Sequence, residues 1–497
     1  MQEADFVAEP PVYDVDRSFF EVSRPSRWRW VRRIGVSIAV SLVGYGGCTL
    51  VDRSLARRDG ERALTAAHTQ LDEQDPNWSW DRLVATRQNA PEGKNSTELI
   101  PKIKKLTHAE WGKELAKGTW KSRLDVQPNV RYSPSILKEV RRELATSADA
   151  AALARSLKDY PSGHREIVLK PNVLDTVLQD TQDTRQTADV LRWDVVLATE
   201  DGDRSRAADD LLALLNASRS VGDEPFLVSQ LVRMAVRAIT VKSVEWHLAQ
   251  TADAVKLKEL QAAFTEDAEE PILLYGVRGE RAAFDRLFEN LDSGAATPAQ
   301  AIDRSFQDTW AQLGWWHYRS NLPADRAYTL SWLTQCVEFA RRPISEQPAL
   351  FATIPVPPNE PTRMLSRLLL PAVDRVAHAH WRGVAEARCA VVGIACERFR
   401  QQHKRWPTAL AELVPAYLPA VPLDPYTAEP LRFTKLEQGV VIHSVGKDLR
   451  GDGGTLNAPP SPTTTYSRFR LWNPEHRHQP PLPEEPAPEQ EQQNDNP

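Results

Sequence analysis

The chain has 497 residues, of which 41% are hydrophobic and 26% charged, and its formal net charge is −5 at pH 7. This composition is typical of a folded protein rather than a wholly disordered one, and the length allows two or three domains. The slightly acidic balance argues against a strongly basic nucleic-acid-binding domain, so we expect no nucleic-acid partner.

The first recognisable element is an uncharged apolar stretch from Ile34 to Val51, long enough to lie at the lower limit for crossing a bilayer. Five arginines precede it and three follow it, which favours a cytoplasmic N-terminus and an extracytoplasmic bulk. We therefore predict a disordered cytoplasmic segment over 1–27 and a transmembrane anchor over 28–52, with lipid contact through 34–51. The protein is expected to be a single-pass protein of the cell inner membrane.

Other N-terminal signals fit this stretch less well. A cleaved signal peptide would have a shorter basic region and a small-residue exit, and a lipoprotein site at Cys48 would have Leu where Tyr45 stands.

The body that follows shows helical periodicity. After a juxtamembrane region over 53–134, we predict a helical domain over 135–342, broken by turns at Glu200–Asp203 and Gly222–Pro225. Helix pairs joined by short turns favour α-hairpins of the tetratricopeptide kind, but no strict repeat is present, and a helix bundle remains the alternative.

Proline then marks two segments. Six prolines between Pro343 and Pro361 predict a semi-rigid connector, and we assign 343–381 to this connector and the start of the next helix. The acidic, proline-rich end of the chain predicts a disordered tail over 457–497.

Residues 382–456 form the most specific pattern in the chain. It consists of a helix over Val384–His403, the segment RWPTALAELVPAYLPAVPLDPY, a strand pair turning at Glu437-Gln438-Gly439 and the loop SVGKDLRGDGG. This pattern resembles the C-terminal domain of type II secretion major pseudopilins. The resemblance implies a small α+β domain with a calcium-holding loop.

The loop supplies the candidate metal ligands. By the resemblance, Asp448 and Asp452 fall where that family places its acidic ligands, and the hydroxyl of Ser444 adds a further oxygen of the type that calcium prefers. Lys447 and Arg450 place two positive charges beside the site, and the alternative is a Gly/Asp-rich turn that closes the sheet. Calcium is the one cofactor that we consider.

The segments DPNWSWDRL, ADDLLALLNASRSVGDEPFLVSQLVRMAVRAI and LLYGVRGERAAFDRLF, together with this C-terminal pattern, resemble large uncharacterised membrane proteins of planctomycete bacteria. The resemblance covers most of residues 60–455. It implies membrane topology and an envelope compartment but no chemistry.

Other residues that invite a functional interpretation have a simpler one. We expect Glu280 to pair with a neighbouring arginine, and the cluster Trp315–Arg319 to serve core packing or helix contact. The pair His378/His380 is a poor chelate, since i and i+2 positions of a helix do not face each other. The pair His476/His478 lies in the predicted tail and could bind metal only weakly.

The four cysteines form no C-x-x-C pair, which argues against a zinc or thioredoxin-type site. Cys389 and Cys396 are too far apart on one predicted helix to bridge, so only Cys336 could pair with either of them. Buried free thiols are the expected state.

The predicted fold is therefore mainly α, with an N-terminal transmembrane helix, an α-hairpin or bundle body and a small pseudopilin-like C-terminal domain. We expect a membrane-anchored extracytoplasmic scaffold that binds other envelope proteins; the oligomeric state is left open. The alternatives are an accessory component of a type II secretion-like apparatus and an unrecognised enzyme with its site in the helical domain. The sequence lacks the G-x-S-x-G, H-E-x-x-H, P-loop and dinucleotide motifs, which argues against an enzyme.

Overall fold

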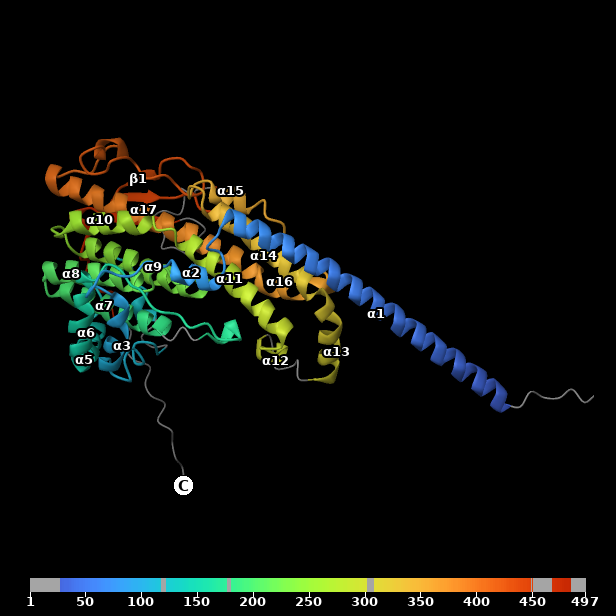
Figure 1. Cartoon of the computed structure of the whole chain (residues 1–497). Coiled ribbons are helices and arrows are strands. Elements are labelled where there is room, and N and C mark those ends of the chain that lie inside the picture. The colour runs from blue at the N-terminus through green and yellow to red at the C-terminus, as the bar shows by residue number, and fades with distance from the viewer. Residues whose placement is uncertain are drawn as a thin grey trace, which may run out of the picture.

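The computed structural model describes residues 27–117, 122–176, 180–301, 308–447, 449 and 467–483. The fold is mainly helical and carries one small antiparallel sheet, which confirms the predicted class at this level (Figure 1). Nearly all of the predicted segment 1–27 and the last part of the predicted tail, 484–497, lie outside the described residues.

The helices and strands differ widely in length, and short 3₁₀ turns connect several of them. Their bounds are α1 Arg27–Gln74, α2 Trp80–Ala85, α3 Ile100–Leu106, α5 Pro134–Thr146, α6 Ala148–Arg155, α7 Asp180–Glu200, α8 Arg204–Arg219, α9 Leu227–Gln250, α10 Leu257–Ala268, α11 Ile272–Ser293, α12 Pro298–Ala301, α13 Thr309–Tyr318, α14 Leu322–Ala340, α15 Gln347–Phe351, α16 Met364–Leu369, α17 Pro371–His403, β1 Arg432–Leu436, β2 Gly439–His443 and β3 Arg468–Trp472.

Helix α1 is a single helix of 48 residues with two different halves. Its N-terminal half projects beyond the body with no other described element beside it, and its C-terminal half lies along α14 (Figure 1). Large apolar side chains of the projecting half, such as Val40 and Val43, are exposed. Over the part of the chain that the structure describes, no helix is both long and apolar enough to cross a membrane. The side chains of residues 42, 44 and 46 fall outside that description, and the anchor over 28–52 stays a prediction.

The hydrophobic core crosses the predicted boundary at residue 382. Helix α17 packs against α9, α10 and the sheet, and almost every side chain from Gly383 to Glu397 is buried. One cluster joins Val244 and Phe264 of the helical body to Val391 of α17 and Ile442 of β2. Because this part of α17 is buried between the body and the sheet, the predicted C-terminal domain 382–456 shares its core with the body.

The sheet has the order β1-β2-β3, and both neighbouring pairs are antiparallel. The predicted strand pair is confirmed, with Phe433 opposite Ile442 across the turn at Glu437-Gln438. The third strand comes from the predicted disordered tail, and that prediction is wrong over residues 467–483. Phe469 and Leu471 of β3 are fully buried, and Phe469 lies directly against Gly393 of α17, so this short segment buries enough apolar surface to be ordered.

The proline-rich connector over 343–381 is folded onto the body. It contains α15, α16 and the first turns of α17, and Phe351 of α15 is buried. The indole of Trp332 in α14 donates a hydrogen bond of 2.9 Å to the carbonyl of Pro355. The prolines therefore shape a packed segment between α14 and α17.

Candidate functional site

The predicted calcium loop begins with a buried hydrogen-bond network centred on Asp424. The hydroxyl of Ser444 donates to Asp424 Oδ1 at 2.9 Å, and the backbone N–H of Val445 donates to Asp424 Oδ2 at 2.8 Å. The N–H of Gly446 donates in turn to Ser444 Oγ at 3.2 Å. Ser444 is fully buried, so its hydroxyl ties the loop to the preceding turn.

Asp448 and Asp452 lie outside the described residues, so the structure does not place the two predicted carboxylate ligands. Among the residues that are described, no group of three or more His, Cys, Asp or Glu side chains is arranged to hold a metal ion. Calcium binding in this loop stays a prediction. Asp424 itself was missed at the sequence level, although the turn Asp424-Pro425-Tyr426 signals it, since the Tyr426 N–H bonds back to the Asp424 carboxylate at 2.9 Å.

Glu280 has a structural role that differs from the predicted ion pair. Its carboxylate accepts a hydrogen bond of 3.0 Å from the backbone N–H of Leu227, the first residue of α9. Burial raises the pKa of Glu280 to about 7. The close approach of Gly279 to Pro225 explains this role, because it brings α11 against the turn before α9 and leaves Glu280 beside the unpaired N–H groups of that helix end.

The aromatic cluster of residues 315–319 divides between core and surface. Tyr318 is buried, and its hydroxyl donates to Asp325, while Trp315 packs beside its ring at 5.4 Å between centroids. Trp316 is 51% exposed, and its ring lies 3.4 Å beneath the guanidinium of Arg53 in α1. Core packing and helix contact, the two predicted roles, are both present.

His380 of α17 and three of the four cysteines are buried. His380 is buried, and burial together with the nearby arginines lowers its pKa to about 3. Cys336, Cys389 and Cys396 are buried free thiols, as expected, and burial raises their pKa well above the ordinary value.

One polar cleft, of about 400 Å³, opens between the C-terminal ends of α7 and α9 and the segment after β3. His247 lines it, with Nδ1 2.8 Å from the hydroxyl of Thr199, and burial lowers the pKa of this imidazole to about 4. His247 Nε2 and Glu200 Oε1 make no hydrogen bond within the described part of the chain. The Thr199–His247 contact places a hydroxyl beside an imidazole, and among the described residues no hydrogen bond from a third group orients that imidazole.

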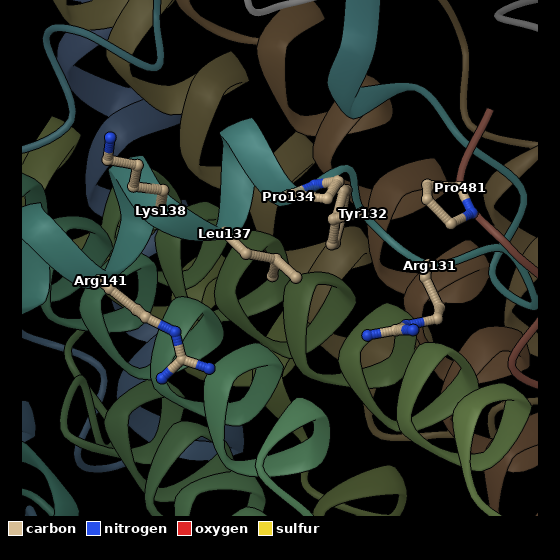
Figure 2. A pocket seen from close by; sticks show the side chains of 7 residues that line it. All are labelled: Arg131, Tyr132, Pro134, Leu137, Lys138, Arg141 and Pro481. Atoms are coloured by element: carbon tan, nitrogen blue, oxygen red, sulfur yellow. The ribbon is translucent and has the colours of Figure 1, made fainter. Parts of the chain in front are cut away.

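A second cleft, of about 360 Å³, lies beside α5 (Figure 2). Figure 2 shows three cationic side chains around it, those of Arg131, Lys138 and Arg141. Two of these cations are neutralised from the end of α7, because Arg131 pairs with Glu200 at 2.7 Å and Arg141 with Asp201. The rim is therefore largely charge-compensated.

Comparisons with protein-family models, with curated proteins and with solved structures found no match to this chain. The resemblances to pseudopilins and to planctomycete membrane proteins therefore stay expectations from sequence.

Proposed function

We propose that this protein is a membrane-anchored scaffold of the bacterial envelope. The apolar stretch 34–51 of α1 sits in the bilayer, and the helical body lies on the extracytoplasmic side, where it binds other envelope proteins. The observation that supports this best is the division of α1 into an exposed apolar half and a half that is fixed to the body.

The fixed half of α1 is joined to the body by specific contacts. Arg57 forms two hydrogen bonds to the carboxylate of Asp292 in α11, at 3.0 and 2.8 Å. His68 Nε2 lies 3.1 Å from Asp285 Oδ1 of the same helix. At Gly60, α1 and α14 approach each other so closely that a Cβ on this glycine would lie 2.7 Å from the backbone nitrogen of Ala324.

This arrangement suits a scaffold. Because α1 continues into the body without a break, the orientation of the body follows that of the anchor. The body itself consists of antiparallel neighbours such as α7, α8 and α9, joined by short turns, in the manner of α-hairpins or a bundle. An unbroken helix would hold the body at a fixed height and angle above the bilayer.

The test is membrane retention of the full chain after alkaline carbonate washing of bacterial membranes. Wild type should remain in the pellet, and Val43→Arg should shift toward the soluble fraction, because an arginine near the middle of a bilayer span costs about 2.5–3.5 kcal/mol. Val356→Arg, at a position of the body that is 87% exposed, is the matched control and should behave as wild type. A wild-type protein released by carbonate would contradict the proposal.

A further inference from the structure

Helix α13 meets α1 just beyond the apolar stretch. The ring of Trp316 stacks under the guanidinium of Arg53, which also donates a hydrogen bond to the Trp316 carbonyl. Arg53 follows Val51, the last apolar residue of the stretch, by two positions. The C-terminal end of α13 therefore lies level with the end of the proposed membrane segment.

Buried contacts hold that end of α13 in place. The Tyr318 hydroxyl donates to Asp325, which also accepts the backbone N–H of Leu365 at 3.0 Å, and the 3₁₀ turn Arg319–Asn321 contacts α1. Figure 1 shows α13 extending away from α1 rather than running along it. The helix thus projects at an oblique angle from α1, at the level where the apolar stretch ends.

Among the described residues, α13 exposes two large apolar side chains, beside the exposed polar residues Gln312 and His317. Leu313 and Trp316, one helical turn apart, are 55% and 51% exposed. Large apolar side chains of α1 at the same level are exposed as well, namely Leu50, Val51 and Leu55. Both helices therefore present exposed apolar side chains near the level at which the stretch 34–51 ends.

We propose that α13 rests on the bilayer surface, with Leu313 and Trp316 in the headgroup region. This inference depends on the proposed function, since it requires α1 to be inserted. Tryptophan favours the membrane–water interface, and a helix lying there buries its apolar face to a depth of about 5–10 Å. Arg53 is placed so that its guanidinium can stack on Trp316 and face lipid phosphates at the same level.

Lipid fits these side chains better than a protein partner because they lie near the end of an apolar stretch that is itself proposed to contact lipid. A helix that projects at an angle from an inserted helix also resists tilting of α1. The bilayer would therefore contact two helices, α1 and α13, whose axes point in different directions.

The test places an environment-sensitive fluorophore on single cysteines in the full chain, in a Cys48→Ser background. The three remaining thiols are buried, so the label goes to the introduced position. Leu313→Cys reports on α13, Val43→Cys on the membrane segment and Val356→Cys on the body. Each protein is reconstituted into liposomes that carry spin-labelled lipids, with the spin label either near the headgroup or deep in the acyl chain.

We expect the probe at position 313 to shift to the blue and lose fluorescence with the shallow spin label but not with the deep one. The probe at 43 should respond most to the deep label, and the probe at 356 to neither. Quenching at 43 with no more quenching at 313 than at 356 would overturn the inference and leave the anchor intact. A blue-shifted but unquenched probe at 313 would identify a protein cover instead of lipid, and the absence of quenching at 43 would remove the anchor and this inference together.

Discussion

Arg477 and Glu397 form a buried two-point ion pair that closes the C-terminal part of the fold. The guanidinium donates to the two carboxylate oxygens at 3.0 and 2.8 Å, and the two side chains are 2% and 0% exposed. Glu397 also accepts hydrogen bonds from Arg400, so Arg477→Ala removes one of its two arginine partners. We expect the free energy of unfolding to fall by about 1.5–3 kcal/mol, as for hydrogen bonds to a charged group. Denaturant unfolding of the detergent-solubilised protein, followed by tryptophan fluorescence, measures this loss.

The control is an exposed pair of the same chemistry. Arg62 lies 3.2 Å from Asp59 on α1 with most of its side chain in solvent. Arg62→Ala should change stability by less than about 1 kcal/mol, because solvent screens such pairs. Equal losses in the two variants would show that the Arg477–Glu397 contact does not form.

Gly279 marks the closest contact between α11 and the turn before α9. A Cβ at this position would lie 1.8 Å from the carbonyl oxygen of Pro225, a backbone atom that cannot swing aside as a flexible side chain can. Gly279→Ala should therefore destabilise the protein by about 1–3 kcal/mol through forced displacement of α11.

Gly314 in α13 provides the comparison, since a Cβ there meets no atom within 4 Å. Gly314→Ala should be stabilising by roughly 0.5–1 kcal/mol, because alanine loses less backbone entropy in a helix. Unfolding midpoints that fall in both variants would contradict the close contact at Gly279.

The raised pKa of Glu280 predicts how the free energy of unfolding depends on pH. Its pKa is raised from 4.5 to about 7 in the folded state, so between these values the folded protein holds a proton that the unfolded chain releases. Through this group, wild type gains stability as pH falls from 7 toward 4.5 and loses it as pH rises through the same range. Glu280→Gln keeps an oxygen for the Leu227 N–H and removes the titration.

We therefore expect Glu280→Gln to gain stability relative to wild type above pH 7, by up to about 3 kcal/mol at 1.36 kcal/mol per pKa unit, with the gain vanishing toward pH 4.5. Other titrating groups are common to both proteins and cancel in the difference. A flat difference for Glu280→Gln would contradict the raised pKa.

The Ser444→Ala variant distinguishes a structural role of the Ser444 hydroxyl from a role as a calcium ligand. Its hydroxyl donates to Asp424 and accepts from the Gly446 N–H, so Ser444→Ala should cost about 1–3 kcal/mol by leaving buried partners unpaired. The loss should be the same with calcium and with chelator. A calcium-dependent loss would instead make Ser444 a ligand, and Asp448→Ala, measured in the same way, reports whether the loop binds calcium at all.

Sequence patterns predicted the elements whose signals are local. The turn at Glu200–Asp203 separates α7 from α8, because Gly202 adopts a left-handed conformation at φ +75° and the Asp203 carboxylate caps α8 through the Arg206 N–H. The β1–β2 hairpin and the end of α17 at His403 followed equally from adjacent residues.

The missed features depend on residues that are distant in sequence. Strand β3 lies among polar and proline-rich residues, and its order comes from pairing with β2 and from contact with α17. Glu280 caps a helix that begins 53 positions earlier, and Asp424 binds residues 20 and 21 positions later. No local pattern reports such partners.

The segment after β3 also has a consequence for the synthesis of this protein. Arg131 donates its backbone N–H to the Gln479 carbonyl at 3.0 Å, and the Asn129 side chain donates to the His476 carbonyl at 2.9 Å. Asn129 is therefore translated early, and its hydrogen-bond partner His476 is added more than 340 residues later. Until then β2 has one unpaired edge and Glu397 lacks Arg477, so this part of the fold can close only after residues 467–483 have been made.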